Sequence, residues 1–398
     1  RPASVSEVAI ARSFRIDGLV RTLWETTHPG FMLVCIALLA SGVQASVLPT
    51  YRALVAGSVG SSFRDVARIV ELPMPSLAEG EVLVKVAYAG VNGGCETFRA
   101  RGEFAFASNR EAEDGFALGA EGVGVVAAVG DGVDNVEIGD AVCFVGGGFA
   151  EYTKAKAQML WKVPRPTGEM AALRISGLTA CAMMEITGKV QAGELVLVTA
   201  AAGGAGHFAV QFAKLAGCTV IGTCSSPEKA RALCGLGCDH IINHRTKDVG
   251  EALERIAPNG VDVAFEGVGG KMLQTVLEHL KEDGRLLQVG YISEYPHNPN
   301  RAEETASNEL EASSLFWKSE TVTRGKQTIY GNAWPKDFGA VAGCKQRVLD
   351  LHASGELKAL VDEKRSFEGL ESVPDAIEYM LSGEAVGKVV VKMGDWCD

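Results

Sequence analysis

The sequence has few basic residues for its length and few charged residues altogether. Lysine and arginine number 38 against 49 aspartates and glutamates, for a formal net charge of -11, and charged residues make up 22% of the chain. A nucleic-acid partner would need a basic face to meet its phosphate backbone, so we expect no such partner. The hydrophobic share of 47% is that of an ordered globular protein rather than a disordered one.

The chain also lacks a long internal repeat, a low-complexity tract and the cysteine spacing of a disulfide-rich scaffold. Its ten cysteines are scattered, mostly through apolar segments, where a free thiol packs as a small hydrophobic group. We therefore predict reduced cysteines. The 398 residues are instead enough for two domains, each with a full core.

Charge is absent from residues 29–51, a stretch that includes the apolar segment Phe31 to Pro49. A helix of this length, at about 1.5 Å per residue, approaches the roughly 30 Å hydrocarbon core of a membrane. Three interpretations stay open: a membrane anchor or membrane-surface helix, a helix packed on protein, and an uncleaved targeting remnant. We expect residues 1–49 to be an extension, and the protein to lie in an organelle, mitochondrion rather than plastid, in association with a membrane.

Two patterns of secondary structure follow the extension. Residues 50–170 contain short strands and glycine turns, which predict a β-rich domain. Residues 171–310 change to alternating strands and helices, and the continuous apolar strands are typical of a doubly wound parallel sheet. Residues 311–398 contain a helix near Lys345 to Ala353 and end in a strand, Gly387 to Met393, which we expect to rejoin the first domain.

A glycine-rich loop, Ala200 to Gly206, follows a predicted strand and precedes an apolar-periodic helix. At such a position the first N–H groups of the helix are unpaired, and glycines let the backbone approach a pyrophosphate closely. The order of strand, loop and helix therefore predicts a dinucleotide-binding Rossmann domain.

The next strand ends in Cys224-Ser225-Ser226, where an NAD site usually carries a carboxylate. An acid there would repel a 2′-phosphate, whereas Ser225, Ser226 and Lys229 could bind one. We therefore predict NADP(H) as the cofactor. Considered alone, Lys229 would more simply be an exposed helix lysine; the two serines and the missing acid favour the phosphate.

Several motifs in a fixed order resemble the zinc-free medium-chain dehydrogenase/reductases, in particular their quinone oxidoreductase and prostaglandin reductase branch. The resemblance covers about residues 50–395. The motifs are VLVTAAAGGAGHFAVQFAK, GTCSSPEKARAL, LGCDHIIN and GYIS, with GVN at Gly90 to Asn92, LGAEGVGVV at Leu118 to Val126, FAEY at Phe149 to Tyr152 and SGLTA at Ser176 to Ala180.

The resemblance implies a split, GroES-like catalytic domain around the Rossmann domain. It places Asn92 and Thr179 near the nicotinamide, and His244 beside the 2′-phosphate, where relatives often have tyrosine. The remaining cofactor positions are the pyrophosphate loop residues Ala202, Gly203, Gly204 and Ala205, and the flanking residues Gly267, Gly290 and Ile292.

Zinc ligands are missing at two positions where the zinc-dependent relatives have them. Asn92 stands where those relatives have a cysteine, and Ala120 stands where they have a histidine. A C-x2-C-x2-C run, typical of their structural zinc lobe, is absent as well. We predict no metal. Glu121, from the same motif, is best interpreted as a buried structural carboxylate, with a catalytic role as the alternative.

The sequence departs from the family at the positions that could donate a proton to the substrate. Relatives often have aspartate where Cys95 stands and tyrosines where Phe98 and Phe104 stand. Asn92 and Cys95 are the candidate catalytic residues, although the Cys95 thiol is a modest acid and could simply be packed. The segment Leu315 to Phe338 is expected to border the substrate pocket.

Two functions therefore stay open. The first is NADPH-dependent reduction of an activated C=C bond or a quinone. The second is a catalytically weakened, NADPH-binding subunit of an organellar membrane complex, docked through Phe31 to Pro49. Whether the chain forms a homodimer is also left open.

Overall fold

The computed structural model describes residues 50–60, 62–100, 116–295, 316 and 320–394. Residues Thr50–Asp398 form one unit, distinct from Arg1–Pro49. The predicted apolar helix Phe31 to Pro49 and Phe104 lie outside the described residues, as does the side chain of Phe98. Within the described part of the chain, no helix combines the length and the apolar character needed to cross a membrane.

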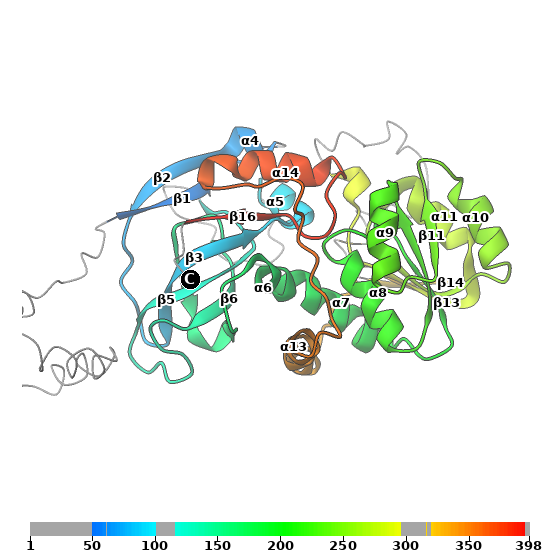
Figure 1. The fold of residues 1–398 in the computed structure, drawn as a ribbon, viewed down its shortest axis with the longest axis horizontal. Helices are drawn as coiled ribbons and strands as arrows, with labels where there is room; N and C mark the ends of the chain where they lie inside the picture. Colours follow the sequence, from blue (N-terminus) through cyan, green and yellow to red (C-terminus); the bar gives the residue numbers. More distant parts are fainter. Residues whose placement is uncertain (1–49, 61, 101–115, 296–315, 317–319, 395–398) are drawn as a thin grey trace, which may run out of the picture. The chain divides into compact units, whose positions relative to one another are not determined.

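A β-rich domain follows the extension, as the sequence predicts (Figure 1). One sheet has the order β2-β1-β4; the other has the order β16-β3-β5-β6-β8, with β7 also paired to β3. Every pairing is antiparallel. The strands are β1 (Thr50–Ala56), β2 (Ala67–Pro73), β3 (Glu81–Gly90), β4 (Phe116–Ala117), β5 (Glu121–Val129), β6 (Ala141–Val145), β7 (Tyr152–Lys156), β8 (Trp161–Lys162) and β16 (Val390–Lys392).

The second domain contains the predicted parallel sheet, with strand order β11-β10-β9-β12-β13-β15-β14. The order in which strands are added reverses at β9: β10 and β11 lie on one side of it, and β12 and β13 lie on the other. Such a switch point is where these folds bind ligands. The strands are β9 (Leu195–Val198), β10 (Thr219–Cys224), β11 (His240–Asn243), β12 (Val261–Glu266), β13 (Leu280–Gln288), β14 (Thr321–Arg324) and β15 (Gln327–Tyr330). The helices are α8 (Gly206–Leu215), α9 (Pro227–Gly235), α10 (Val249–Ile256) and α11 (Gly270–Glu278).

The nucleotide-binding sheet extends beyond the predicted boundary at residue 310. Strands β14 and β15 form an antiparallel hairpin that joins the sheet through β13. Within Leu315 to Phe338, Thr321–Arg324 and Gln327–Tyr330 are thus strands of this sheet, and the expectation that the segment borders a substrate pocket stays a prediction. Residue Phe316 is different, because its ring lies 5.4 Å from that of Tyr291.

A helical segment links the domains, and the end of the chain returns to the first one. The link comprises α6 (Gly168–Ala172), a π-helix (Leu173–Gly177), α7 (Leu178–Cys181) and a second π-helix (Ala182–Thr187). π-helical turns are frequent at functional sites. The return uses α13 (Phe338–Ala353), which packs on α7, α14 (Val373–Leu381), which packs on α5 (Gly93–Ala100), and β16, which pairs with β3. The end of the chain thus rejoins the first domain through α14 and β16.

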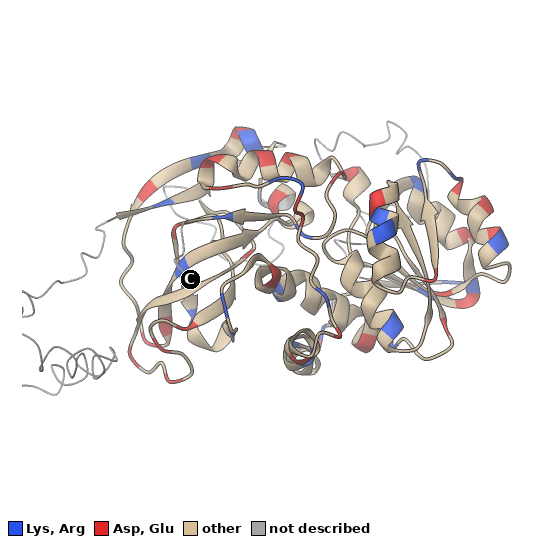
Figure 2. Cartoon of the chain, viewed as in Figure 1, with Lys and Arg blue, Asp and Glu red and all other residues tan. Residues whose placement is uncertain are grey.

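The shorter helical elements are α4 (Phe63–Val66) and the 3₁₀ turns Ala157–Met159, Ile292–Glu294 and Leu370–Ser372. Figure 2 shows acidic and basic positions interspersed on both domains.

Candidate cofactor and active site

The glycine loop has the geometry that an anion requires. Ala200 has a positive φ of 44°, and a Cβ at Gly206 would lie 2.4 Å from the Ala200 carbonyl oxygen, so only glycine fits there. Helix α8 begins at Gly206 with Ala205 as its N-cap, and Ala205 supplies no side-chain hydrogen bond. The helix start, with Ala202 and Gly204 before it, can therefore offer N–H groups to a pyrophosphate, whereas the Gly203 N–H already donates to the Ala200 carbonyl at 2.9 Å.

The glycine loop is held to the catalytic domain by a buried histidine. His207 Nδ1 donates to the Gly203 carbonyl at 2.8 Å, and its Nε2 accepts from the Leu360 N–H at 3.0 Å. This acceptor role requires a neutral ring, and burial lowers the pKa of His207 to about 4. The Gly387 N–H donates to the Ala202 carbonyl at 2.7 Å and adds a second tie.

The predicted 2′-phosphate residues gather at the end of β10. Ser226 caps α9, its Oγ accepting from the Lys229 N–H at 3.2 Å, and Ser225 precedes it. Lys229 Nζ donates to the carbonyl of Gly383 at 2.6 Å. Burial, then the charge of Lys364, lowers the pKa of Lys229. A buried ammonium bonded to a neutral carbonyl is a ready partner for an anion.

His244 lies next to this group. Its backbone N–H donates to the Cys224 carbonyl at 3.0 Å, so the residue follows β11 beside the end of β10. Its side chain is exposed, and desolvation, followed by the charges of Arg245 and Lys229, lowers the pKa of His244. The structure thus brings the four predicted residues to one edge of the sheet.

The predicted flanking residues meet at the carboxyl ends of β12 and β13. The Ile292 N–H donates to the Gly267 carbonyl at 3.1 Å, and a Cβ at Gly290 would lie 3.6 Å from that same oxygen. The Glu266 carboxylate stabilises this turn by accepting hydrogen bonds from the N–H groups of Val268 and Gly269. Burial raises the pKa of Glu266 to about 7.

Asn92 belongs to a closed polar network. Its Nδ2 donates to Glu121 Oε1 at 2.8 Å, and its Oδ1 accepts from Lys388 Nζ at 2.7 Å. Lys388 also pairs with Glu121 Oε1 at 2.6 Å and lies 3.3 Å from Ser176 Oγ. The Lys388 side chain is 2% exposed and that of Glu121 0%, which agrees with the interpretation of Glu121 as a buried structural carboxylate.

Zinc does not fit at this place. The amide of Asn92 and the methyl group of Ala120 are not zinc ligands of the usual kind, which are thiolate, imidazole and carboxylate. The nearby carboxylate, Glu121, already pairs with an ammonium that would repel a metal cation. Among the described residues, no group of three histidines, cysteines or acids has the arrangement of a metal site.

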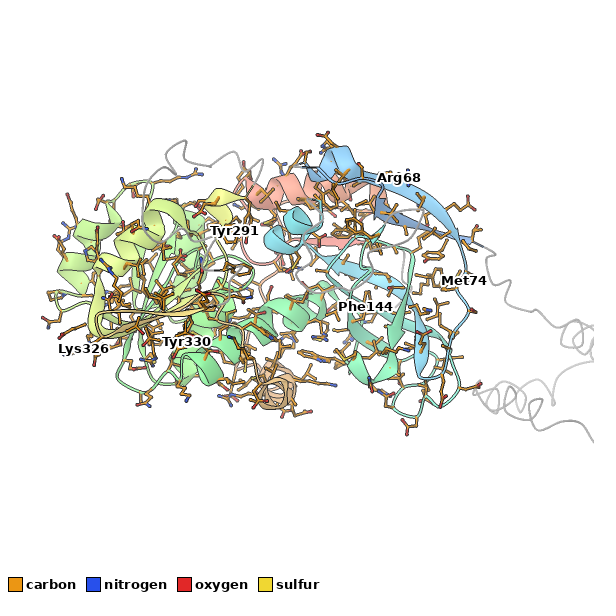
Figure 3. All side chains as sticks on the ribbon, turned by 180° about the vertical axis from the view of Figure 1, so that it is seen from behind. Arg68, Met74, Phe144, Tyr291, Lys326 and Tyr330 are labelled. Atoms are coloured by element: carbon orange, nitrogen blue, oxygen red, sulfur yellow. The ribbon has the colours of Figure 1, made fainter. Side chains whose placement is uncertain are left out.

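The structure adds two tyrosines that sequence reasoning missed. Tyr295 is buried; its hydroxyl would lie 2.9 Å from a Cβ at Gly290, and its ring 3.4 Å from one at Gly93. Burial, then Tyr291, raises the pKa of Tyr295, with a smaller contribution from Cys95. The rings of Tyr291 and Tyr295 are 4.9 Å apart (Tyr291 is labelled in Figure 3). The available signal was their place in GYISEY, directly after a predicted strand.

Cys95 and Thr179 occupy less decisive positions. Cys95 is buried in α5, close enough to Tyr295 to influence it. Thr179 is half-buried in α7, three residues after Ser176, which contacts Lys388. Their assigned roles stay predictions.

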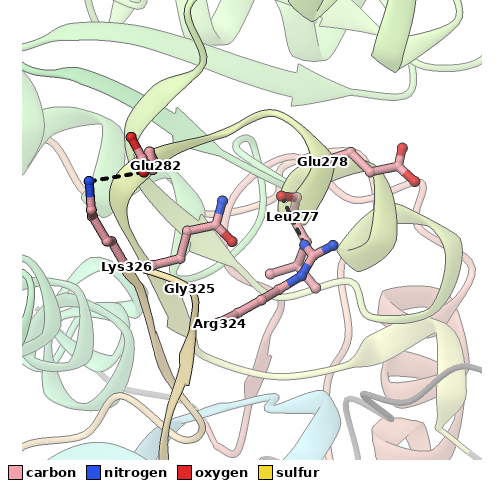
Figure 4. A pocket seen from close by; sticks show the side chains of 7 residues that line it. Leu277, Glu278, Glu282, Arg324, Gly325 and Lys326 are labelled. Carbon is pink, nitrogen blue, oxygen red and sulfur yellow. Dashed lines mark hydrogen bonds and ion pairs between the residues drawn. The ribbon is translucent and has the colours of Figure 1, made fainter.

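A surface cavity lies away from these residues. It measures about 550 Å³ and lies where the β14–β15 hairpin meets the end of α11 (Figure 4). Its lining is mostly polar and charged, including the exposed pair Lys326 and Glu282. None of the predicted cofactor residues lines it.

Comparisons with known proteins agree with this geometry. Residues 78–165 match the "Alcohol dehydrogenase GroES-like domain" family, and residues 204–338 match the family described as "Zinc-binding dehydrogenase". The chain is 36% identical over 346 residues to a "Probable quinone oxidoreductase" of Leishmania amazonensis, which covers 86% of this chain and 98% of the relative. It is 35% identical over 359 residues to "Prostaglandin reductase-3" of Mus musculus, covering 88% and 92%.

A solved structure is similar over nearly its whole length. The enoyl reductase CurK superposes with a TM-score of 0.69 at 27% sequence identity, covering 87% of this chain and 100% of that one.

Proposed function

Because the chain belongs to the medium-chain dehydrogenase/reductase family, we propose that it is an NADPH-dependent reductase of activated C=C bonds, as found in enones and quinones. The relatives named as quinone oxidoreductase, prostaglandin reductase and enoyl reductase support this class of substrate. The observation that carries the proposal is the contact between the glycine loop and the Asn92 network. A Cβ at Gly204 would lie 3.4 Å from both Lys388 Cδ and Ser176 Oγ.

Buried cation chemistry supports NADPH over NADH. The Lys229 ammonium is bonded to the Gly383 carbonyl, and a second cation, Lys364, is near enough to lower its pKa. A 2′-phosphate would compensate the charge of Lys229 and could accept from Ser225 and Ser226. NADH, with a hydroxyl in that position, would leave the ammonium uncompensated.

The chemistry requires hydride, an orienting surface and a proton. NADPH, when bound, supplies the hydride. Addition of hydride to the electron-poor carbon moves an electron pair onto the carbonyl oxygen, and one proton completes the reduced product. We assign stabilisation of that oxygen to the Tyr295 hydroxyl, which burial keeps protonated. Cys95, which lies close enough to Tyr295 to raise its pKa, is the alternative donor.

The experiment is NADPH oxidation by the purified full chain with enone and quinone acceptors, with identification of the reduced product. We expect turnover with NADPH and at least tenfold less with NADH. Tyr295→Phe should lower kcat by about 100-fold, the scale of one positioned proton donor. Tyr330→Phe, on strand β15, is the control. Absence of turnover with every acceptor class would reject the proposal.

A further inference from the structure

Lys388 is the most deeply buried ammonium of the candidate site and has a carboxylate, an amide and a hydroxyl around it. Its Nζ lies 2.6 Å from Glu121 Oε1, 2.7 Å from Asn92 Oδ1 and 3.3 Å from Ser176 Oγ. An ammonium has three N–H donors and no acceptor, so these three contacts use its whole capacity. The side chain has no remaining group to give to a substrate.

This contact fixes the orientation of the Asn92 amide. Only oxygen can face the ammonium, so Oδ1 points to Lys388 and Nδ2 to the other side. Nδ2 donates to Glu121 Oε1 at 2.8 Å and to the Gly90 carbonyl at 3.3 Å. Glu121 in turn is held through Oε2, which accepts from the Ile175 N–H at 2.7 Å. Both N–H groups of Asn92 are therefore engaged, and its oxygen keeps one lone pair for a donor on a bound ligand.

The backbone at Lys388 connects this amide to the glycine loop. Gly387 forms a bridge with Gly203, and its N–H donates to the Ala202 carbonyl. Two residues later, Val389 accepts from the Val91 N–H at 3.0 Å, next to Asn92. The backbone on either side of Lys388 thus contacts both the pyrophosphate loop and the residue next to Asn92, and these backbone contacts do not depend on the Lys388 side chain.

We propose that Lys388 is a positioning residue: its ammonium is an internal cation of the active site that holds the Asn92 oxygen in the orientation that meets the nicotinamide. This inference rests on the proposed function for the identity of the cofactor. In this chain the charge of Glu121 is compensated by the Lys388 ammonium.

A purely structural ion pair is the competing explanation, and the two differ in one variant. Lys388→Met alone leaves Glu121 buried without its cation, which lowers stability whichever explanation holds. The double variant Lys388→Met/Glu121→Gln removes both charges at similar volume. A structural pair would be replaced without loss of rate, whereas a positioning cation would not.

The experiment compares the full-length double variant with the wild type and with the control Lys281→Met/Asp262→Asn. The control neutralises a lysine–aspartate pair, also 2.6 Å apart, in the nucleotide-binding sheet. We measure melting temperature, NADPH affinity, the fluorescence of bound NADPH, kcat and the acceptor KM. We expect the double variant to fold, to bind NADPH within about threefold of wild type, and to lose about 10- to 100-fold in kcat with a smaller change in KM, as for misplaced contacts.

Several results would overturn the inference. These are wild-type kcat in the double variant, an equal loss in the control, loss of NADPH affinity in proportion to kcat, or one catalytically required zinc per wild-type chain. If the wild type binds NADPH but reduces no acceptor, the proposed function fails by itself. The fluorescence of bound NADPH then decides: a change in the double variant but not in the control supports positioning, and no change rejects it.

Discussion

Two buried lysines, one at each end of the cofactor site, have different surroundings. Lys388 is 2% exposed and pairs with the carboxylate of Glu121. Lys229 is 9% exposed and bonds to a neutral carbonyl, that of Gly383. Burial disfavours a charge in both places, but only at Lys388 does a bonded carboxylate offset the cost.

This difference indicates that Lys388 orders the protein itself, whereas Lys229 recognises a ligand. A lysine whose partner is an internal carboxylate orders the protein around it, so its loss should affect folding and rate. A lysine that lacks a bonded anion is suited to receive one from a ligand, so its loss should affect affinity. The following experiments test this separation.

Removing the carboxylate that pairs with Lys388 should have the largest effect on stability. Glu121→Leu leaves the Lys388 ammonium buried without its anion, and we expect the free energy of unfolding to fall by about 3–5 kcal/mol. Urea unfolding followed by circular dichroism measures this change. As the control, Glu282→Gln breaks a pair whose side chains are 71% and 77% exposed and should cost less than about 1 kcal/mol. Similar losses for both variants would erase the distinction between buried and exposed pairs.

Acid should lower the free energy of unfolding through the buried His207. Its pKa is about 4 in the folded protein against 6.5 when unfolded, so the unfolded chain binds the extra proton first. Stability from this group is complete above pH 6.5 and declines as the pH falls from 6.5 to 4, by about 3 kcal/mol in total.

Glu266 acts in the opposite direction over an overlapping range. Its pKa is raised from 4.5 to about 7, so its contribution declines as the pH rises through that interval. Unfolding free energies of wild type and His207→Gln, measured from pH 4 to 7, isolate the histidine by difference. A constant difference across that range would contradict the assignment of a neutral buried His207.

At the other end of the cofactor site, Lys229→Ala should weaken NADPH binding by about 1–3 kcal/mol, because one charge-assisted hydrogen bond to the 2′-phosphate is lost. NADH affinity should stay almost unchanged. Titration of nicotinamide fluorescence measures both. The control is Arg231→Ala, which removes an exposed positive charge from the same helix. Equal losses for the two cofactors would refute the phosphate assignment.

The smallest effect is expected from shortening the chain. Strand β1 begins at Thr50, and the unit Thr50–Asp398 contains both lysines. A chain that begins at Ser46 should therefore melt and bind NADPH as the full chain does, to within about 0.5 kcal/mol. Failure of the shortened chain to fold would contradict this. Attachment of Phe31 to Pro49 to a membrane or an organellar complex stays a prediction, and co-sedimentation of the two chains with membranes tests it.

Local patterns in the sequence determined much of this protein. Strand and helix periodicity predicted the parallel sheet, and the loop Ala200 to Gly206 predicted the pyrophosphate site. The residues Ser225, Ser226 and Lys229 predicted a binding site for a 2′-phosphate. These features depend on neighbours within a few residues, such as the turn that requires Gly206 and the helix cap at Ser226. Local chemistry of this kind can be read along the chain.

The tertiary structure decided which groups meet across long stretches of sequence. Lys388 reaches Asn92 over 296 residues, and Lys229 reaches Gly383 over 154. Nothing local distinguishes Lys388 from a surface lysine, or Tyr295 from a packed aromatic residue. The hairpin β14–β15 likewise joins the sheet only because β13 offers it an edge. Such contacts exist only after long loops have closed and the two domains have packed, so their energies leave no periodic signal in the sequence.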